Sequence, residues 1–529
     1  MELYSAGHRR GVVCAPHYSA VEAGHAILGD GGNAIEAMLA MAASIAAVYP
    51  HMNHLGGDGF WLIREPNGRV RAFMAAGPAG AMATPAYYRE HETIPPRGPL
   101  AALTVPGAVG GWRLALEAAK ANGGKFPLYA LIGPAIEQTR SGYKVTRSQA
   151  RLTEEHLAGL KDAPGFAETF LVDGKAPTVG TLLKQAALTE TLVQLGYEGL
   201  DDFYRGDVGR EIAADLERIG SPITREDLTR YEAKLAEPLR VDLPAGVVYN
   251  TDAPTQGVVA LMILALFARL GVTEAEGFDH IHGLVEATKR ALRLRDRVVT
   301  DPNYLAHPLA RCLEERYIAG EAMKIDRRKA APWPLGRGAG DTIWMGAADT
   351  SGLVVSYIQS LYWEFGSGCV LPRTGILMQN RGASFSLEAG ALNLLAPGRL
   401  PFHTLNPALA VLRDGRIMAY GCMGGDGQPQ TQGAVFTRHV QFKEPLGEAI
   451  DRPRWLLGRT WGAARTALRL ESRFNGNLVD KLQDAGHDIE VLDDPYSDIM
   501  GHAGAVVLHP DGTCEGAHDP RADGGAAGL

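Results

Sequence analysis

The chain has 529 residues and a mass of 56.6 kDa, with 46% apolar and 21% charged residues, as is usual for a large globular protein. Its 52 Lys and Arg against 60 Asp and Glu give a net charge of −8, so we expect neither nucleic acid nor an anionic membrane as a partner. The five cysteines include no CxxC pair, which disfavours a disulfide framework or a structural zinc site.

The sequence shows no sign of targeting to a membrane or of secretion. Its first residues lack the apolar segment of a secretory signal. The most apolar stretch, 35–48, is too short to span a bilayer and fits a buried helix better. We therefore expect a cytoplasmic protein.

The first 75 residues predict two helices followed by a β-hairpin. The second helix follows Asn33, which fits an N-cap, and it is apolar on nearly every face, as a buried helix is. Asn67-Gly68 is typical of a tight hairpin turn. The predicted elements are helices 19–28 and 33–48 and strands near 60–63 and 70–73.

The middle of the chain is predicted to be mainly helical. It ends in a basic, Gly- and Pro-rich segment, 324–340, which is the clearest break in the sequence. The predicted elements are helices near 110–122, 127–141, 147–160, 181–196, 207–218, 256–271, 277–297 and 308–323 and a strand over 238–250.

Beyond this break the alternation of apolar and polar residues predicts paired strands, with turns at 349–352 and 414–415. Two mostly antiparallel sheets flanked by helices account for the pattern. The predicted elements are strands 342–348, 352–360, 406–412, 416–422, 467–471, 503–508 and 514–517 and helices 428–443 and 473–485.

The sequence gives no good support for three common kinds of functional motif. The Gly-rich segment 29–34 lacks the spacing and the preceding strand of a dinucleotide-binding loop, so we interpret it as a turn between helices. The His pairs within 51–54 and 279–282 lack an i, i+4 spacing with a third ligand, so we predict no metal site and no cofactor. The absence of a G-x-S-x-G motif argues against a serine hydrolase of that class.

Two other positions have an unusual context. Thr342 stands where the flexible segment meets an apolar strand, a place where a β-branched hydroxyl is ordinarily structural. Gly424 and Gly425 lie in a Gly-rich turn between a strand and a helix. The N–H groups of such a turn can hold an anion or an oxyanion, although a plain loop is the simpler interpretation.

Short motifs are spread over nearly the whole chain, each of them weak and their order specific. They are Gly31–Ala37, Pro50-His51 with Leu55–Phe60, Val105–Gly107, Ala253–Gly257, Asp341-Thr342 with Asp349 and Gly352, Phe365–Gly368, Asn406-Pro407, Gly424-Gly425 and Gly516–Arg521. Together they resemble the gamma-glutamyltransferase (glutathione hydrolase) family of N-terminal-nucleophile hydrolases. The segments Tyr362–Gly366 and Gly424–Gln430 are most similar to the branch that includes oxamate amidohydrolase and acylases.

The resemblance implies an α+β fold, the αββα four-layer sandwich, made as an inactive precursor that cuts itself. Cleavage between Asp341 and Thr342 gives a large subunit, 1–341, and a small subunit, 342–529. The two belong to one interleaved domain and stay associated, and a dimer of such heterodimers remains open.

The resemblance also implies the catalytic roles. The freed Thr342 supplies the Oγ nucleophile and an α-amine, whose ordinary pKa of about 7.7–8.0 suits a general base. The N–H groups of Gly424 and Gly425 stabilise the oxyanion. Ser360 lies where the family has a hydroxyl beside the nucleophile, which assists cleavage or orients Thr342.

The positions that bind a glutamyl group in the family are changed in this chain. A charge-assisted pair is stronger than a neutral hydrogen bond, so the loss of both ion-pair partners weakens recognition of an α-amino acid. The substrate-binding positions are Met74 (Arg in the family), Tyr362 (Asn), Arg381 (Gln), Ser384 (part of an acidic pair) and His403-Thr404 (two serines).

We therefore predict a self-processing amidohydrolase that cleaves an amide of a small carboxylic acid, of oxamate-like or acylase type. Arg381 and His403 are expected to meet a substrate carboxylate, because a small anionic acyl group needs a cation; an ordinary surface or loop charge is the alternative for each. Two other functions stay open: gamma-glutamyl transfer or glutathione hydrolysis, and an uncleaved, non-catalytic role.

Overall fold

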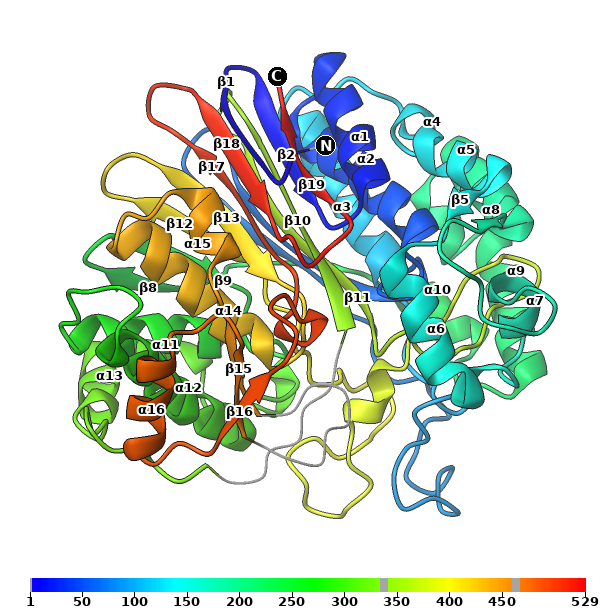
Figure 1. Ribbon diagram of the computed structural model, residues 1–529. Coiled ribbons are helices and arrows are strands. Elements are labelled where there is room, and N and C mark those ends of the chain that lie inside the picture. Colours follow the sequence, from blue (N-terminus) through cyan, green and yellow to red (C-terminus); the bar gives the residue numbers. More distant parts are fainter. Residues whose placement is uncertain (1, 334–340, 459–466) are drawn as a thin grey trace.

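The computed structural model describes residues 2–333, 341–458 and 467–529. Two seven-stranded sheets stack face to face, and helices cover the outer side of each sheet (Figure 1). The predicted αββα four-layer sandwich is therefore confirmed.

The first sheet holds the two strands that follow the break in the sequence at its centre. Every pair of neighbours in it is antiparallel. The central strands are buried on both faces, which explains their nearly continuous apolar sequences. In spatial order the strands are β19 (Gly525–Gly528), β2 (Gly11–Ala15), β10 (Asp341–Asp349), β11 (Val354–Tyr362), β3 (Asp58–Arg64), β4 (Val70–Ala75) and β7 (Lys234–Ala236).

The second sheet is also antiparallel throughout and combines strands from both ends of the chain. In spatial order its strands are β1 (Tyr4–His8), β18 (Cys514–His518), β17 (Ala503–Leu508), β13 (Ile417–Cys422), β12 (Ala408–Leu412), β9 (Gly246–Asn250) and β8 (Leu239–Leu243). The smaller sheets are β14 (Trp455–Leu457), β15 (Leu468–Glu471) and β16 (Ile489–Leu492), and β5 (Tyr143–Lys144) with β6 (Leu182–Leu183).

The helices form the two outer layers. Helix α2 (Ala34–Val48) is fully buried against the first sheet, and Asn33 caps it in a reciprocal bond with Glu36. No helix in the described parts of the chain is both long and apolar enough to cross a membrane. The other helices over the first sheet are α1 (Tyr18–Gly29), α3 (Ala108–Ala121), α4 (Leu128–Leu131), α5 (Gly133–Ser141), α6 (Arg147–Leu160), α7 (Phe166–Phe170), α8 (Ala186–Glu198), α9 (Asp207–Ile219) and α10 (Arg225–Arg230).

The opposite layer covers the second sheet. Its helices pack against β8, β9 and β13 through a second apolar core. They are α11 (Gly257–Arg269), α12 (Phe278–Val298), α13 (Glu315–Ala322), α14 (Gly427–Phe436), α15 (Leu446–Asp451) and α16 (Gly476–Asp484).

The structure corrects several sequence-based boundaries. The strand predicted over 238–250 is the hairpin β8–β9, because 244–245 turn the chain. The helix predicted over 428–443 is α-helical only to Phe436. It continues as a π-helical turn over 437–441. The sequence analysis also missed eight of the described strands. β2 lies inside the first sheet, and the others are short or lie at sheet edges: β1, β5, β6, β7, β14, β16 and β19. β6 falls within the predicted helix 181–196, which begins only at Ala186.

The core between the sheets is built around Trp344, which is 1% exposed. Glycines at the facing positions make room for its indole. A Cβ on Gly421 would lie 2.2 Å from Trp344 Cδ1, and one on Gly504 would lie 2.5 Å from its Cζ3. The spacing of the sheets near the start of β10 is thus set by one large side chain and by glycines that lack any.

We expect Gly421→Ala to lower the melting temperature, because overpacking a buried site costs about 1–3 kcal/mol. Gly320→Ala is the matched control: it lies in α13 with no atom within 4 Å of the added carbon, so its melting temperature should stay the same or rise. Differential scanning calorimetry measures both. An unchanged melting temperature in Gly421→Ala would contradict this account of the core.

Candidate active site

Thr342 lies at the start of β10, inside the molecule. It is 1% exposed, and the β10–β11 register shifts between Asp341 and Ile343, so Thr342 occupies a bulge. Bulges of this kind commonly re-aim a side chain next to an active site. Gln428, in the first turn of α14, points its amide at the hydroxyl, with Nε2 3.4 Å from Thr342 Oγ1.

The same end of the sandwich gathers the ends of several strands. β10 starts there, β11 ends at Tyr362, β3 starts at Asp58, and β13 of the other sheet ends at Cys422. Ser360 on β11 is directly opposite Asp58 on β3. Strand pairing therefore fixes the predicted nucleophile, the predicted helper hydroxyl and a carboxylate beside one another.

Gly424 and Gly425 form the turn between β13 and α14. Their φ angles are +112° and +51°, in the region that side-chain-bearing residues rarely adopt. The carbonyl of Gly424 accepts the N–H of Gly427 at 2.7 Å. Within the described part of the chain, the N–H groups of Gly424 and Gly425 donate to no other group, so both are available to an anion.

Ser360 and Tyr362 shape the other side of the site. Ser360 is buried, and its Oγ accepts the N–H of Tyr362 at 2.8 Å. Tyr362 has φ +86° and Phe365 has φ +58°. Non-glycine residues held in this region store about 1–3 kcal/mol each, and such strain is concentrated at functional sites.

Arg381 is a buried cation that forms no ion pair with any described residue, although the charge of Asp58 acts on it from a greater distance. Arg381 is 1% exposed, and none of its three guanidinium nitrogens makes a hydrogen bond to any residue that the structure describes. Its guanidinium carbon lies 4.0 Å from the centre of the Tyr362 ring. Burial lowers the pKa of Arg381 to about 10. Burying an unpaired charge destabilises the folded protein unless an anion binds to it.

His403 and Asp58 lie next to this cation. Asp58 Oδ1 accepts the N–H groups of Gly77 and Gly107, each at 3.0 Å, while Oδ2 is 3.2 Å from His403 Nε2 but out of line for a hydrogen bond. Burial, with the positive charge of Arg381, lowers the pKa of His403 to about 4 against the opposing effect of Asp58. His403 is therefore neutral near pH 7.

The remaining predicted positions differ in their surroundings. Thr404 Oγ1 is buried and has no hydrogen-bond partner among the described residues. Ser384 is half-buried and donates to the carbonyl of Phe402 at 3.2 Å. Met74 on β4 is half-buried and packs on the core between the sheets. Asp341 is the first residue of β10.

Some residues of the site were not assigned a role from the sequence. Asp58 and Gln428 fall within the family motifs, but only the structure brings them to His403 and Thr342. Gln256 also lies in a motif, and its amide reaches the carbonyl of Gly425. These contacts join residues that are far apart in the chain, so local spacing carries no signal for them.

One group of described residues offers three potential metal ligands: His282, Glu286 four residues on, and His487. The sequence did not indicate this grouping. The ligand atoms already have protein partners: His282 Nδ1 is 2.9 Å from His487 Nε2, and His282 Nε2 donates to the carbonyl of Asp326 at 2.8 Å. Glu286 accepts from Lys289 at 2.7 Å. We interpret the group as a structural link between α12 and the segment after α16.

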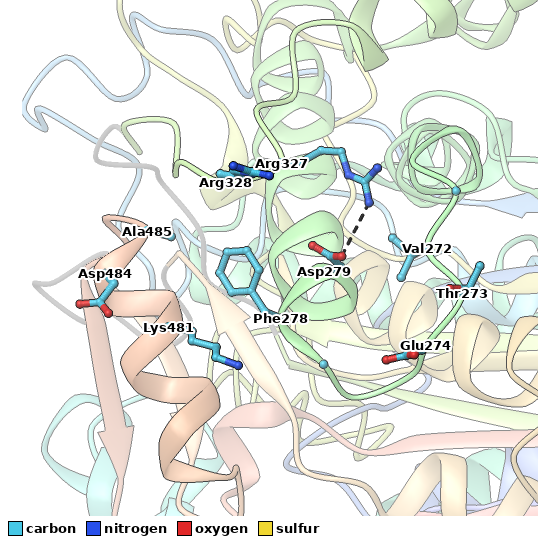
Figure 2. Close-up of a pocket in the computed structure, with 12 residues that line it drawn as sticks. Val272, Thr273, Glu274, Phe278, Asp279, Arg327, Arg328, Lys481, Asp484 and Ala485 are labelled. Atoms are coloured by element: carbon cyan, nitrogen blue, oxygen red, sulfur yellow. Dashed lines mark ion pairs between the residues drawn. The ribbon is translucent and has the colours of Figure 1, made fainter.

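A pocket of about 650 Å³ lies between the start of α12 and α16 (Figure 2). Arg327 and Asp279 face each other there at 3.7 Å, and Lys481 and Asp484 line it from α16. The lining mixes both signs of charge and contains no residue of the site around Thr342. We assign this pocket no part in the chemistry.

Comparison with known proteins identifies the family. The family model described as Gamma-glutamyltranspeptidase matches residues 20–529. The oxamate amidohydrolase proenzyme of Klebsiella pneumoniae is 51% identical over 98% of both chains, and the glutathione hydrolase-like YwrD proenzyme of Bacillus subtilis is 38% identical over 98% of both. Cephalosporin acylase from Bacillus halodurans superposes with a TM-score of 0.91, at 29% identity, over 100% of this chain and 97% of that one. The chain belongs to the gamma-glutamyltranspeptidase family.

Buried histidines make the fold sensitive to acid. Burial lowers the pKa from the ordinary 6.5 to about 3 for His17, His54 and His487 and to about 4 for His403 and His518, and it holds that of His51 well below 6.5. Between pH 6.5 and 4 the unfolded chain therefore binds protons that the folded chain does not, and stability falls as the pH falls through this range.

We expect the melting temperature to drop progressively from pH 6.5 to pH 4.5. His518→Leu should make the fall in melting temperature with pH shallower, because this variant lacks one ring that takes up a proton on unfolding. His91 is exposed, so His91→Gln should leave the pH dependence unchanged. Melting temperatures recorded as a function of pH provide the measurement. A wild-type protein that is equally stable at both pH values would contradict the prediction.

Proposed function

We propose that this chain is a self-processing amidohydrolase whose nucleophile is Thr342, freed by cleavage of the Asp341–Thr342 bond. The proposal is supported by the buried position of Thr342 at a strand start, facing Gln428 and near the Gly424–Gly425 turn. Relatives whose names include the word proenzyme cover almost the whole chain.

In the proposed cleavage, Thr342 Oγ attacks the carbonyl carbon of Asp341, and its proton passes to the nitrogen of Thr342. The acyl group moves from nitrogen to oxygen, and water then hydrolyses the ester, leaving a carboxylate on Asp341 and an amine on Thr342. The buried Ser360 is suited by its place opposite Asp58 to assist this step. Until cleavage the nitrogen of Thr342 is an amide and cannot act as a base.

The two fragments are expected to stay together. β10 and β11 of the 342–529 fragment lie between β2 and β3 of the 1–341 fragment in one hydrogen-bonded sheet. Breaking one peptide bond at the start of β10 leaves these pairings intact. We propose that the fragments form one interleaved domain, and a cytoplasmic location stays a prediction.

Turnover uses the same groups. The α-amine of Thr342, with an ordinary pKa of about 7.7–8.0, takes the proton of Oγ as the oxygen attacks the substrate amide. The N–H groups of Gly424 and Gly425 stabilise the oxyanion, each donor being worth about 3–4 kcal/mol in related chemistry. The amine then passes its proton to the leaving ammonia or amine, and water hydrolyses the ester and regenerates Thr342.

The substrate class is inferred from the guanidinium of Arg381, which has no hydrogen-bond partner among the described residues. A buried cation whose guanidinium has no hydrogen-bond or ion-pair partner among the described residues fits a substrate that brings its own carboxylate, and neutral His403 beside it can add a hydrogen bond. We propose the amide of a short dicarboxylic acid, of the kind that the name of the oxamate amidohydrolase relative describes. Met74 packs in the apolar core, where a glutamyl-binding enzyme of the family has an arginine.

We expect purified wild-type protein to consist of two associated fragments, of 341 and 188 residues, and Thr342→Ala to remain a single chain of 529 residues without turnover. Thr342→Ser keeps the hydroxyl and should cleave and react more slowly. Thr350→Ala, at an exposed position in the turn after β10, should behave as wild type. Intact mass and ammonia release are measured together. Full turnover by an unbroken chain, or by Thr342→Ala, would refute the mechanism.

Arg381→Met should reduce kcat/KM for oxamate by roughly a hundredfold or more, because losing one partner of a buried charge pair costs about 2–5 kcal/mol. The same change should raise the melting temperature, since it removes an unpaired buried charge.

Arg399→Met is the matched control. Arg399 is also buried but donates to the carbonyls of Leu392 and Leu394, so its loss should lower the melting temperature.

Rates on oxamate, glutathione and a glutaryl amide separate the candidate substrates. Faster hydrolysis of glutathione than of oxamate would favour the gamma-glutamyl activity instead.

A further inference from the structure

The Gly424–Gly425 turn has no side chain of its own to hold it in place. Both residues have positive φ angles, which glycine adopts easily. Glycine adopts several other conformations just as easily, so the backbone alone does not fix the turn. A donor pair that must meet a developing oxyanion needs a fixed orientation, since displacement by about 1 Å can cost about a hundredfold in rate. The orientation must come from contacts to the backbone of the turn.

Gln256 supplies such contacts. It precedes α11, is fully buried, and uses both N–H groups of its amide: Nε2 donates to the carbonyl of Gly425 at 2.9 Å and to the carbonyl of Thr404 at 2.8 Å. One side chain thus joins the glycine turn to the segment that carries His403 and Thr404.

The orientation of this amide is itself fixed. Gln256 Oε1 accepts from Arg295 Nη1 at 2.9 Å, and the reversed amide would place its NH₂ against the guanidinium and its oxygen against two carbonyls. Arg295 is held in turn by the carboxylate of Asp426, with which it forms a buried ion pair. Burial alone would lower the pKa of Arg295, but the carboxylates of Asp426 and Asp296 raise it, so it stays charged.

These contacts close a loop on the turn. Asp426 follows Gly425 directly, so the side chain of Asp426 and the carbonyl of Gly425 are both bound to the Arg295–Gln256 pair. Two attachment points on either side of the Gly425–Asp426 peptide prevent that peptide from rotating. The backbone of Gln256 adds a further link, because its N–H donates to the carbonyl of His403 at 3.0 Å.

We propose that Gln256 is a positioning residue that sets the orientation of the Gly424–Gly425 turn and couples it to the substrate-binding segment at His403 and Thr404. This inference rests on the proposed function, since it assigns the turn to the oxyanion. Gln256 itself touches no reacting atom. Its loss should release the peptide after Gly425, while the nucleophile and the guanidinium of Arg381 remain in place.

The test compares Gln256→Met, which keeps the length of the side chain but has no N–H donor, with Gln149→Met. Gln149 is equally buried on α6 and donates to the hydroxyl of Tyr143 at 3.0 Å, away from the site. Both proteins are checked for self-cleavage and then studied by hydrogen–deuterium exchange and by steady-state kinetics on oxamate.

We expect faster exchange of the amides in 423–428 and 402–406 in Gln256→Met and no change there in Gln149→Met. We also expect kcat to fall about 10- to 100-fold with KM changed less than threefold, since ground-state binding is kept while oxyanion stabilisation is lost. Unchanged exchange in 423–428 overturns the proposal, as does an equal loss of kcat in both variants.

The two readouts separate this inference from the proposed function. If wild-type protein hydrolyses no amide, the proposed function fails, but exchange in 423–428 still decides whether Gln256 holds the turn. If Gln256→Met does not fold, Gln256→Glu replaces it, because a carboxylate of the same size can bind Arg295 but cannot donate to the two carbonyls. Wild-type exchange in Gln256→Glu would then overturn the proposal.

Discussion

The pairing of β10 with its neighbours is the constraint on which the rest of the structure depends. β11 pairs with β10 from Asp341 to Ala348, while β2 pairs only with the second half of β10, Gly346–Asp349. The start of β10 is therefore held by β11 on one edge, and Thr342 is buried there. The proposed cleavage leaves these pairings intact, because the strand that follows the new terminus stays bound on both edges. The inter-sheet core under Trp344 then sets how close the opposite sheet comes with its glycine turn.

Two buried arginines near this turn show how the protein distributes charge. Arg295 is paired with Asp426 and bound to Gln256, so it is satisfied within the protein and serves to hold backbone. Arg381 packs on the face of Tyr362 and forms no ion pair with any described residue, although the charge of Asp58 acts on it from a greater distance. Leaving a buried charge without its partner costs about 3–5 kcal/mol, because the charge is then uncompensated. The first arginine belongs to the framework, and the second is suited to a ligand.

Much of the fold follows from local sequence, and the site follows only in part. The helix 33–48 is evident from its Asn33 cap and continuous apolar face, and strands 342–348 and 352–360 from two β-like runs on either side of a turn. The resemblance to a family predicted that Arg381 and His403 bind substrate; the structure shows that both are buried. Gln256 could not be assigned, because its partners lie 39 to 169 residues away and no periodicity reports such contacts. For the same reason His487 was not linked to His282.

The strained and unpaired groups of the site require support from elsewhere, and the C-terminal segment provides it. Arg454 is buried, forms an ion pair with Asp519 and donates to the carbonyl of Gly501 at 2.8 Å. Gly501 lies directly behind the turn, since a Cβ on Gly424 would be 3.4 Å from its Cα. Asp519 is also held by Arg521, which binds Glu471 through two nitrogens. The charges of this network are paired within the protein, and it fixes the back of the turn while Gln256 fixes its carbonyl. The two N–H groups at the front of the turn, which donate to no described residue, are the ones that the proposed mechanism uses.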